Sequence, residues 1–134
     1  MNRVNNSPLH EKLGIKEGFK IKLINEPEHY LDLLNGIRPQ INLLKKLKEP
    51  VDLIHLFSRS KDELSVEFPY LKNFIYKNGM FWVSWPKKSS SNVSDLTEHV
   101  VREIGLMNGL VDTKLCSIDE NWSALKFVYR LKDR

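Results

Sequence analysis

Two short, almost uninterrupted apolar segments, at Val51–Phe57 and Gly79–Trp85, constrain the fold of this chain more than any other feature. A strand that is apolar at nearly every position is buried on both faces, as parallel strands are in α/β proteins. Between the two segments, Ser60 and Glu63 have the spacing of a capping box, and apolar residues follow at helical spacing up to Ile75. This strand, helix and strand predict two adjacent parallel strands at the centre of a sheet.

The C-terminal part predicts a second helix and a hairpin. Asp95 and Glu98 form another capping-box pattern, and the helix that they begin carries apolar residues on one face up to Met107. The last two predicted strands, Leu110–Ile118 and Ser123–Leu131, are too close in sequence for a crossover connection. They are therefore expected to form an antiparallel β-hairpin.

The N-terminal part adds weaker elements to this pattern. Phe19–Ile24 alternates apolar and basic residues and predicts a strand, whereas Gln40–Leu44 predicts only a short one. Short helices are predicted around Leu9 and Leu13 and again from Tyr30 onward. The sum is an α/β protein with a three-layer, Rossmann-like mixed sheet, in which parallel strands are followed by a C-terminal antiparallel hairpin.

Length and composition set limits on the class of protein. The 134 residues are expected to form one domain, residues 1–134, and 41% hydrophobic with 28% charged residues excludes a disordered or fibrous chain. The apolar runs are too short to span a bilayer and the N-terminus lacks an apolar signal core, so we expect a soluble cytoplasmic protein without a membrane partner. The single Cys116 and the scattered histidines predict no metal site.

Four segments of the chain resemble an uncharacterised bacterial family of small proteins of unknown function. They are VDLIHLF, GMFWVSWPKK, SDLTEHVVREIGLMNGLVD and CSIDENWSALKF, and the likeness runs from about Leu13 to Arg130. The resemblance implies a truncated methyltransferase-like Rossmann domain. It implies no activity, because none is assigned to the family.

The two cofactor signals of such a fold are missing. A glycine-rich turn is expected after the first strand, but Asn25-Glu26-Pro27-Glu28 follows Ile24 and no glycine occurs before Gly36. An acid for the ribose hydroxyls is expected after the second strand, where Lys45 and Lys46 stand instead. The sequence therefore predicts no S-adenosylmethionine or dinucleotide in the usual pose, and no cofactor.

The candidate site lies beyond the carboxyl ends of the parallel strands, where open α/β sheets bind ligands. The loops expected at this edge contribute nine candidate residues: Asn25, Glu26, Arg59, Trp85, Lys87, Lys88, Asp119, Glu120 and Trp122. The basic members could hold a phosphate or carboxylate, the acids could act as bases or form ion pairs, and the tryptophans could form a stacking wall. We place the best small-anion site between Arg59, Lys87 and Lys88. The competing interpretation is a set of ion pairs that only stabilises loops.

Single residues add no catalytic signature. His55 lies between two apolar residues in a central strand and is expected to be a hydrogen-bonded core histidine. Ser84 lacks the flanking glycines of a nucleophile elbow.

Three functions remain open. The favoured one is a protein, not an enzyme, that binds a small anionic ligand or a protein partner. The second is a small methyltransferase-like enzyme with a displaced cofactor pose, using Glu26 or Asp119 as base and Lys87 as anion clamp. The third is weak nucleic-acid binding through doublets such as Lys45 and Lys46, which the modest net charge of +4 disfavours.

Overall fold

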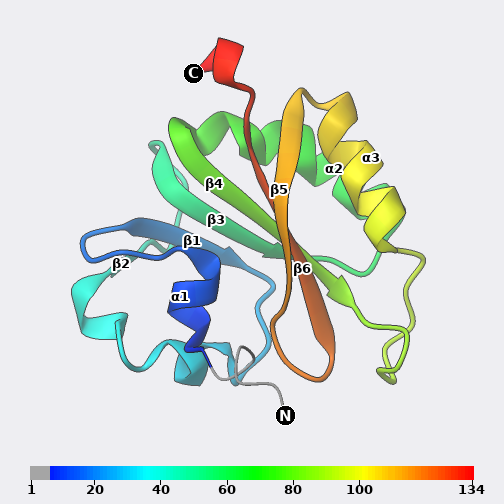
Figure 1. Ribbon diagram of the computed structural model, residues 1–134, viewed down its shortest axis with the longest axis horizontal. Helices are drawn as coiled ribbons and strands as arrows, with labels where there is room; N and C mark the ends of the chain where they lie inside the picture. Colours follow the sequence, from blue (N-terminus) through cyan, green and yellow to red (C-terminus); the bar gives the residue numbers. More distant parts are fainter. Residues whose placement is uncertain (1–6) are drawn as a thin grey trace.

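The computed structural model describes residues 7–134, which form a mixed β-sheet with helices on both faces (Figure 1). Among these residues the sheet has six strands in the order β2-β1-β3-β4-β6-β5. Their bounds are β1 (Lys20–Ile24), β2 (Asn42–Leu43), β3 (Val51–Phe57), β4 (Ile75–Pro86), β5 (Leu110–Ser117) and β6 (Trp122–Tyr129).

The strand directions confirm the predicted fold class. β2, β1, β3 and β4 are parallel, with Leu56 of β3 opposite Val83 of β4. β6 pairs antiparallel with both β4 and β5, so the C-terminal hairpin lies beyond β4 as expected. This is a Rossmann-like arrangement in which the strand order reverses between β1 and β3.

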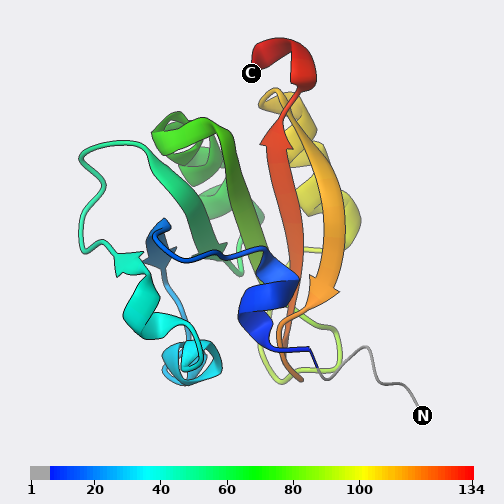
Figure 2. The same cartoon turned by 60° about the vertical axis from the view of Figure 1, so that its left-hand side comes forward.

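The helices form two layers around the sheet (Figure 2). α2 (Lys61–Leu71) and α3 (Glu98–Met107) cover one face, and α1 (Leu9–Leu13) with the 3₁₀ helix η2 (Tyr30–Leu34) covers part of the other. The remaining 3₁₀ turns are η3 (Arg38–Gln40), η4 (Lys72–Phe74) and η5 (Leu131–Asp133). Each layer buries its own apolar cluster against the sheet, centred on Phe68, Phe81 and Phe127 below α2 and α3 and on Trp82 and Tyr30 on the α1 side.

The boundary between α2 and β4 differs from the prediction. The helical spacing of the apolar residues predicted a helix through Ile75, but the helix ends at Leu71 and the strand already begins at Ile75. Pro69 lies within the last helical turn and the chain then tightens into η4, since proline removes a helical hydrogen bond. Gly79 lies inside β4, where an added Cβ would come within 2.9 Å of a β3 carbonyl oxygen. This close approach requires glycine.

The start and end of α3 also correct the prediction. The N-cap is Thr97, whose hydroxyl accepts a hydrogen bond from the amide of Val100. Asp95, the predicted cap, instead accepts a bond from the amide of Lys61 and ties the loop to the start of α2. Met107, predicted in the core, is 85% exposed, because the buried stripe runs through Val101 and the residues one turn further on.

The N-terminal elements are shorter than predicted. β2 contains only two residues, and the helix after β1 is the 3₁₀ helix η2. Within residues 7–134, no helix has the length and apolar character needed to cross a membrane.

Candidate functional site

The carboxyl ends of β1, β3 and β4 lie at one edge of the sheet, together with the tip of the β5–β6 hairpin. All nine predicted site residues lie at or directly beyond this edge, but they do not form one cluster. The structure places three of them, Trp85, Lys87 and Lys88, in a pocket beside β4 and the hairpin, and Asn25 and Glu26 in a separate loop that follows β1. The other four, Arg59, Asp119, Glu120 and Trp122, line neither this pocket nor the hollows beside that loop.

The pocket beside β4 has a volume of about 410 Å³ and opens between the start of α3 and the hairpin. Its lining residues come from four separate segments: Trp85, Lys87, Lys88, Glu98, Leu115, Cys116, Ser117 and Ser123. The sheet register explains part of this convergence, because Ser123 of β6 pairs with Trp85 on one side and with Ser117 on the other. These three side chains therefore point to the same face of the sheet. We call this set of residues the lysine pocket.

The charges of the lysine pocket are unevenly balanced. The ammonium of Lys87 donates a 2.6 Å hydrogen bond to Ser117 Oγ, whereas the exposed Lys88 forms none of the ion pairs found within residues 7–134. Glu98, the acid of the lining, is paired with Arg102. The pocket thus keeps a local excess of positive charge with hydroxyl groups beside it.

Arg59, predicted as the third member of the anion site, is not in this lining. Its guanidinium carbon lies 5.3 Å from the ring centre of Trp122, in a cation–π contact. Trp122 is 4% exposed and packs edge-to-face on Phe57, so its ring belongs to the core and offers little surface for stacking. Trp85 is also buried, although its edge lines the pocket.

The two acids of the hairpin tip differ in their surroundings. Asp119 Oδ1 accepts hydrogen bonds from the amides of Asn121 and Trp122, and Oδ2 lies 2.6 Å from Nε2 of His29. Oδ1 holds the turn and Oδ2 contacts His29 of the segment after β1, so this carboxylate would have to give up a contact to act as the base of a methyltransferase-like reaction. Glu120 is exposed and forms no ion pair among residues 7–134.

The loop after β1 lies across the point where the strand order reverses. Asn25 has a left-handed backbone, with φ of 60°, and its side-chain amide donates to the carbonyl of Phe57 at the end of β3. The hollows on either side of the loop share no lining residue: one contains Asn25 and three acids of α2, and the other contains Glu26 with Arg38 and Lys45.

This geometry does not fit S-adenosylmethionine in the usual pose. The cofactor of this fold class lies along one continuous crevice over the first strand, held by a glycine-rich turn. Here Asn25 spans that crevice and no glycine relaxes the loop before Gly36. Lys45, which lines the hollow beside β2, cannot accept a hydrogen bond from ribose hydroxyls.

A fully buried polar chain lies beneath the β1 and β3 ends. The hydroxyl of Tyr30 lies 2.7 Å from Nδ1 of His55, and Nε2 of His55 lies 2.7 Å from Oγ of Ser84. A neutral imidazole satisfies both contacts in either tautomer, and burial lowers the pKa of His55 to about 3. His55 is thus the hydrogen-bonded core histidine that was predicted, with no exposed surface.

The acidic hollow beside Asn25 contains one buried oxygen that lacks a partner. Glu67 Oε1 is inaccessible and unbonded, and its pKa is raised by burial and then by the neighbouring Glu63. Within residues 7–134, no group of three or more His, Cys, Asp and Glu side chains has the arrangement of a metal site.

Comparison with known structures identifies the fold as that of S-adenosylmethionine-dependent methyltransferases. A ribosomal protein methylase from Lactobacillus delbrueckii subsp. bulgaricus matches 91% of this chain and 76% of its own, at 14% identity and a TM-score of 0.61. A SAM-dependent methyltransferase from Aquifex aeolicus matches 89% and 86%, at 13% identity and a TM-score of 0.61. Magnesium protoporphyrin IX methyltransferase from Synechocystis PCC 6803 matches 91% and 79%, at 10% identity and a TM-score of 0.59.

These identities are low enough that the likeness concerns the fold alone. Models of known protein families give no match to the sequence, and neither do curated proteins. The comparison therefore establishes the fold class, and the chemistry has to be argued from the residues at the edge of the sheet.

Sequence reasoning missed the part of the lysine pocket that comes from the hairpin and α3. Ser117 and Ser123 were not singled out, and Glu98 was predicted only as a helix-capping residue, because each is an ordinary polar residue in its own segment. Alternation along the two hairpin strands would have placed both serines on the face of Trp85. The missing information was the register between β4 and β6.

Proposed function

We propose that this protein binds a small anionic ligand in the lysine pocket, and that it does so without S-adenosylmethionine. The observation that carries the proposal is the convergence of Lys87 and Lys88 with two serine hydroxyls in one pocket. Ammonium groups and the hydroxyl of Ser123 can donate to phosphate and carboxylate oxygens, whereas the Ser117 hydroxyl already donates a 3.0 Å hydrogen bond to the carbonyl of Asp119. Trp85 and Leu115 add an apolar wall for the body of a ligand.

Size and charge support a small ligand. About 410 Å³ lies within the range of pockets that hold small molecules. The pairing of Glu98 with Arg102 removes most of the repulsion that an anion would otherwise meet at the start of α3. Lys88 is free to turn toward a ligand, while Lys87 would exchange or share its bond to Ser117.

Thermal unfolding in the presence of inorganic phosphate tests this function. Phosphate also stabilises proteins without binding them, so the wild type is compared with the Lys87→Ala, Lys88→Ala double variant and with a Lys45→Ala, Lys46→Ala control of equal charge. A bound ligand at about 100 times its Kd adds about 2.7 kcal/mol to the free energy of unfolding. We expect a saturable increase in Tm for the wild type and the control, and its loss in the pocket variant. Equal responses of the three proteins would refute the site.

A methyltransferase-like enzyme is the second candidate, and its support is the shared fold. Asn25 across the crevice argues against the usual cofactor pose, and the engaged carboxylate of Asp119 argues against a displaced version that uses this acid as its base. Titration of the wild type with S-adenosylmethionine separates the two candidates. We expect no saturable change in Tm at millimolar concentration, and a micromolar Kd would favour the enzyme instead.

A further inference from the structure

Two lysines face each other directly on the side of the sheet that carries α1. Lys114 of β5 and Lys126 of β6 are partners in the antiparallel register, and the pair two positions further on, Cys116 and Ala124, belongs to the α1-side cluster. Both lysines therefore point to the α1 face, away from the lysine pocket. Like charges directly opposite each other destabilise a sheet.

No acid compensates this pair within residues 7–134. Neither lysine takes part in the ion pairs of the structure, although Lys114 donates a 2.7 Å hydrogen bond to the carbonyl of Lys12 at the end of α1. Lys126 is half-buried, and its pKa is lowered first by burial and then by Lys114, with no acidic group acting in the opposite direction. Lys12 adds a third positive charge to this region. Burial raises the pKa of the Cys116 thiol, and the nearby charges of Lys114 and Lys12 both act to lower it.

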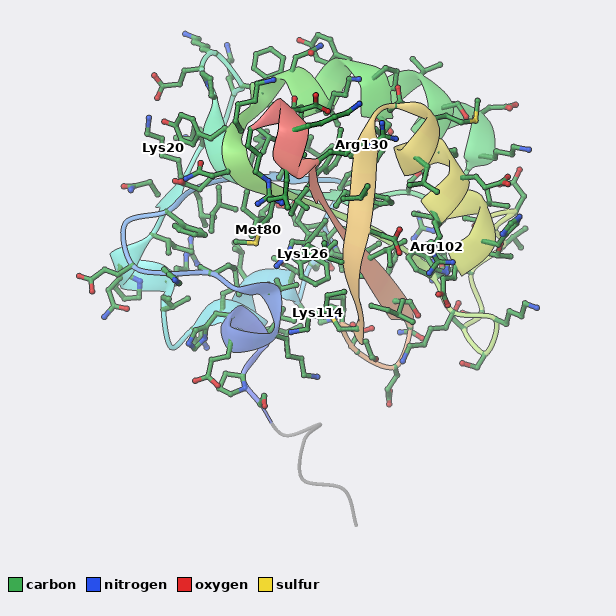
Figure 3. All side chains as sticks on the ribbon, turned by 45° about the horizontal axis from the view of Figure 1, so that its top comes forward. Lys20, Met80, Arg102, Lys114, Lys126 and Arg130 are labelled. Carbon is green, nitrogen blue, oxygen red and sulfur yellow. The ribbon has the colours of Figure 1, made fainter. Side chains whose placement is uncertain are left out.

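The surroundings leave room for a ligand at this pair. Figure 3 shows Met80, Lys126 and Lys114 following one another across the sheet beside α1, with Arg130 just beyond the end of β6. Within residues 7–134, no helix other than α1 lies in front of this part of the sheet (Figure 1). A hollow of about 500 Å³ adjoins Lys114 and Lys12 on the side away from Lys126, which does not line it, and its one acidic lining residue is Glu11.

We infer that Lys114 and Lys126 bind a small polyvalent oxyanion on the α1 face of the sheet, at a second site separate from the lysine pocket. Two ammonium groups without a counter-charge require an anion of at least two charges for neutralisation. A phosphate or polyphosphate group meets this requirement. The half-buried methylene part of the Lys126 side chain lies beside Met80. This packing already restricts the side chain, so binding an anion at its ammonium would lose less conformational entropy.

The substitution Lys126→Met tests whether repulsion between Lys114 and Lys126 lowers the stability of the unliganded protein. Methionine has a similar length but no charge, so without polyvalent anions we expect the variant to unfold at a Tm about 1–3 °C above the wild type at low salt. A lower Tm would show that Lys126 makes a favourable contact in the unliganded protein and would overturn the inference. Lys126→Gln repeats the test with a polar side chain, in case methionine perturbs the sheet.

Binding is measured with inorganic pyrophosphate as the probe, by following backbone amide signals of β5 and β6 by NMR at constant ionic strength in chloride. We expect saturable shifts at Lys114 and Lys126 in the wild type, and a Kd at least about tenfold higher in Lys126→Met. The matched control is Lys132→Met, on the exposed η5, which should retain the wild-type Kd. Equal Kd values for both variants, or no saturable shift in the wild type, would overturn the inference.

The Lys87→Ala, Lys88→Ala variant separates this site from the proposed function. It should keep the pyrophosphate shifts at Lys114 and Lys126 even if it loses the phosphate response of the lysine pocket. Loss of the β5 and β6 shifts in that variant would mean that one site produces both effects, and would overturn the inference of a second site.

Discussion

The sheet edge has two halves, one beyond β1 and β3 and one beyond β4 and the hairpin, and their loops leave different space for a ligand. Beyond β1 and β3, Asn25 spans the crevice and a loop without glycine separates two hollows. Beyond β4 and the hairpin, side chains from four segments surround one pocket that contains Lys87 and Lys88. Open α/β sheets bind ligands beyond the carboxyl ends of their parallel strands, so the fold alone would allow a ligand site anywhere along this edge. The residues restrict the favourable part of it to the second half.

The difference extends into the core beneath each half. On the α1 face the buried chain of Tyr30, His55 and Ser84 links the segment after β1 to β3 and β4, whereas on the other face Trp85 lines the lysine pocket. Buried polar chains specify one packing because every member needs its partner. We therefore expect the first half to respond strongly to core substitutions and weakly to ligands, and the second half to do the reverse.

The largest effect is expected from removing one hydroxyl under the first half. Tyr30→Phe keeps the ring but leaves Nδ1 of His55 without a partner in a site with no exposure to water. An unsatisfied buried polar group costs about 1–3 kcal/mol of the free energy of unfolding, which chemical denaturation measures. The control Tyr70→Phe, at a ring that is 62% exposed, should change stability by less than about 0.5 kcal/mol. Similar small changes in both variants would mean that the polar chain does not hold this half together.

The next effect concerns pH and His55. Its pKa in the folded protein is about 3, below the ordinary 6.5, so the unfolded chain takes up the proton first as the pH falls. The stability that depends on neutral His55 is present above pH 6.5 and is lost as the pH falls toward 3. At about 1.36 kcal/mol per pH unit, this loss amounts to about 2 kcal/mol between pH 6.5 and pH 5.

The measurement compares denaturation curves of the wild type and His55→Gln at both pH values. The variant lacks the titrating group, so its free energy of unfolding should fall by about 2 kcal/mol less than that of the wild type over this range. The acids that titrate in this range are common to both proteins and cancel in the comparison. Parallel pH profiles would show that the imidazole is not held neutral by the fold.

Much of the fold follows from local pattern, and the corrections have physical reasons. The apolar runs at β3 and β4 were sufficient to predict the parallel strands at the centre of the sheet. The short spacing of the last two strands was sufficient to predict the antiparallel hairpin at its end. The start of β4 was misplaced because Ile75 continues the helical spacing of α2 while Pro69 disrupts that helix. The spacing of apolar residues favoured a longer helix, whereas the ring of Pro69 disfavours one, and the helix ends two residues after the proline.

The candidate site was predictable as an edge but not as a pocket. Lys87 and Lys88 were placed correctly beyond β4, because the end of a strand can be recognised from Pro86. Their pocket partners depend on strand register, which no local pattern in β6 or α3 specifies. Arg59 was assigned to the same cluster from topology alone, whereas its contact with Trp122 turns it away.

The smallest effect is expected at Asn25, the residue that spans the first half. Its φ of 60° is a conformation that glycine adopts without cost, asparagine tolerates and alanine resists. Asn25→Ala and Asn25→Gly both lose the 3.4 Å bond to the carbonyl of Phe57, so they differ in backbone strain and in the entropy of the unfolded chain, of which the strain is expected to be larger. We expect the glycine variant to be more stable than the alanine variant by about 1 kcal/mol in chemical denaturation. Because Glu26 and Pro27 still follow, Asn25→Gly should gain no saturable response to S-adenosylmethionine. A gain of such binding would mean that one side chain keeps the first half closed to the cofactor, and that the difference between the two halves is smaller than the structure indicates.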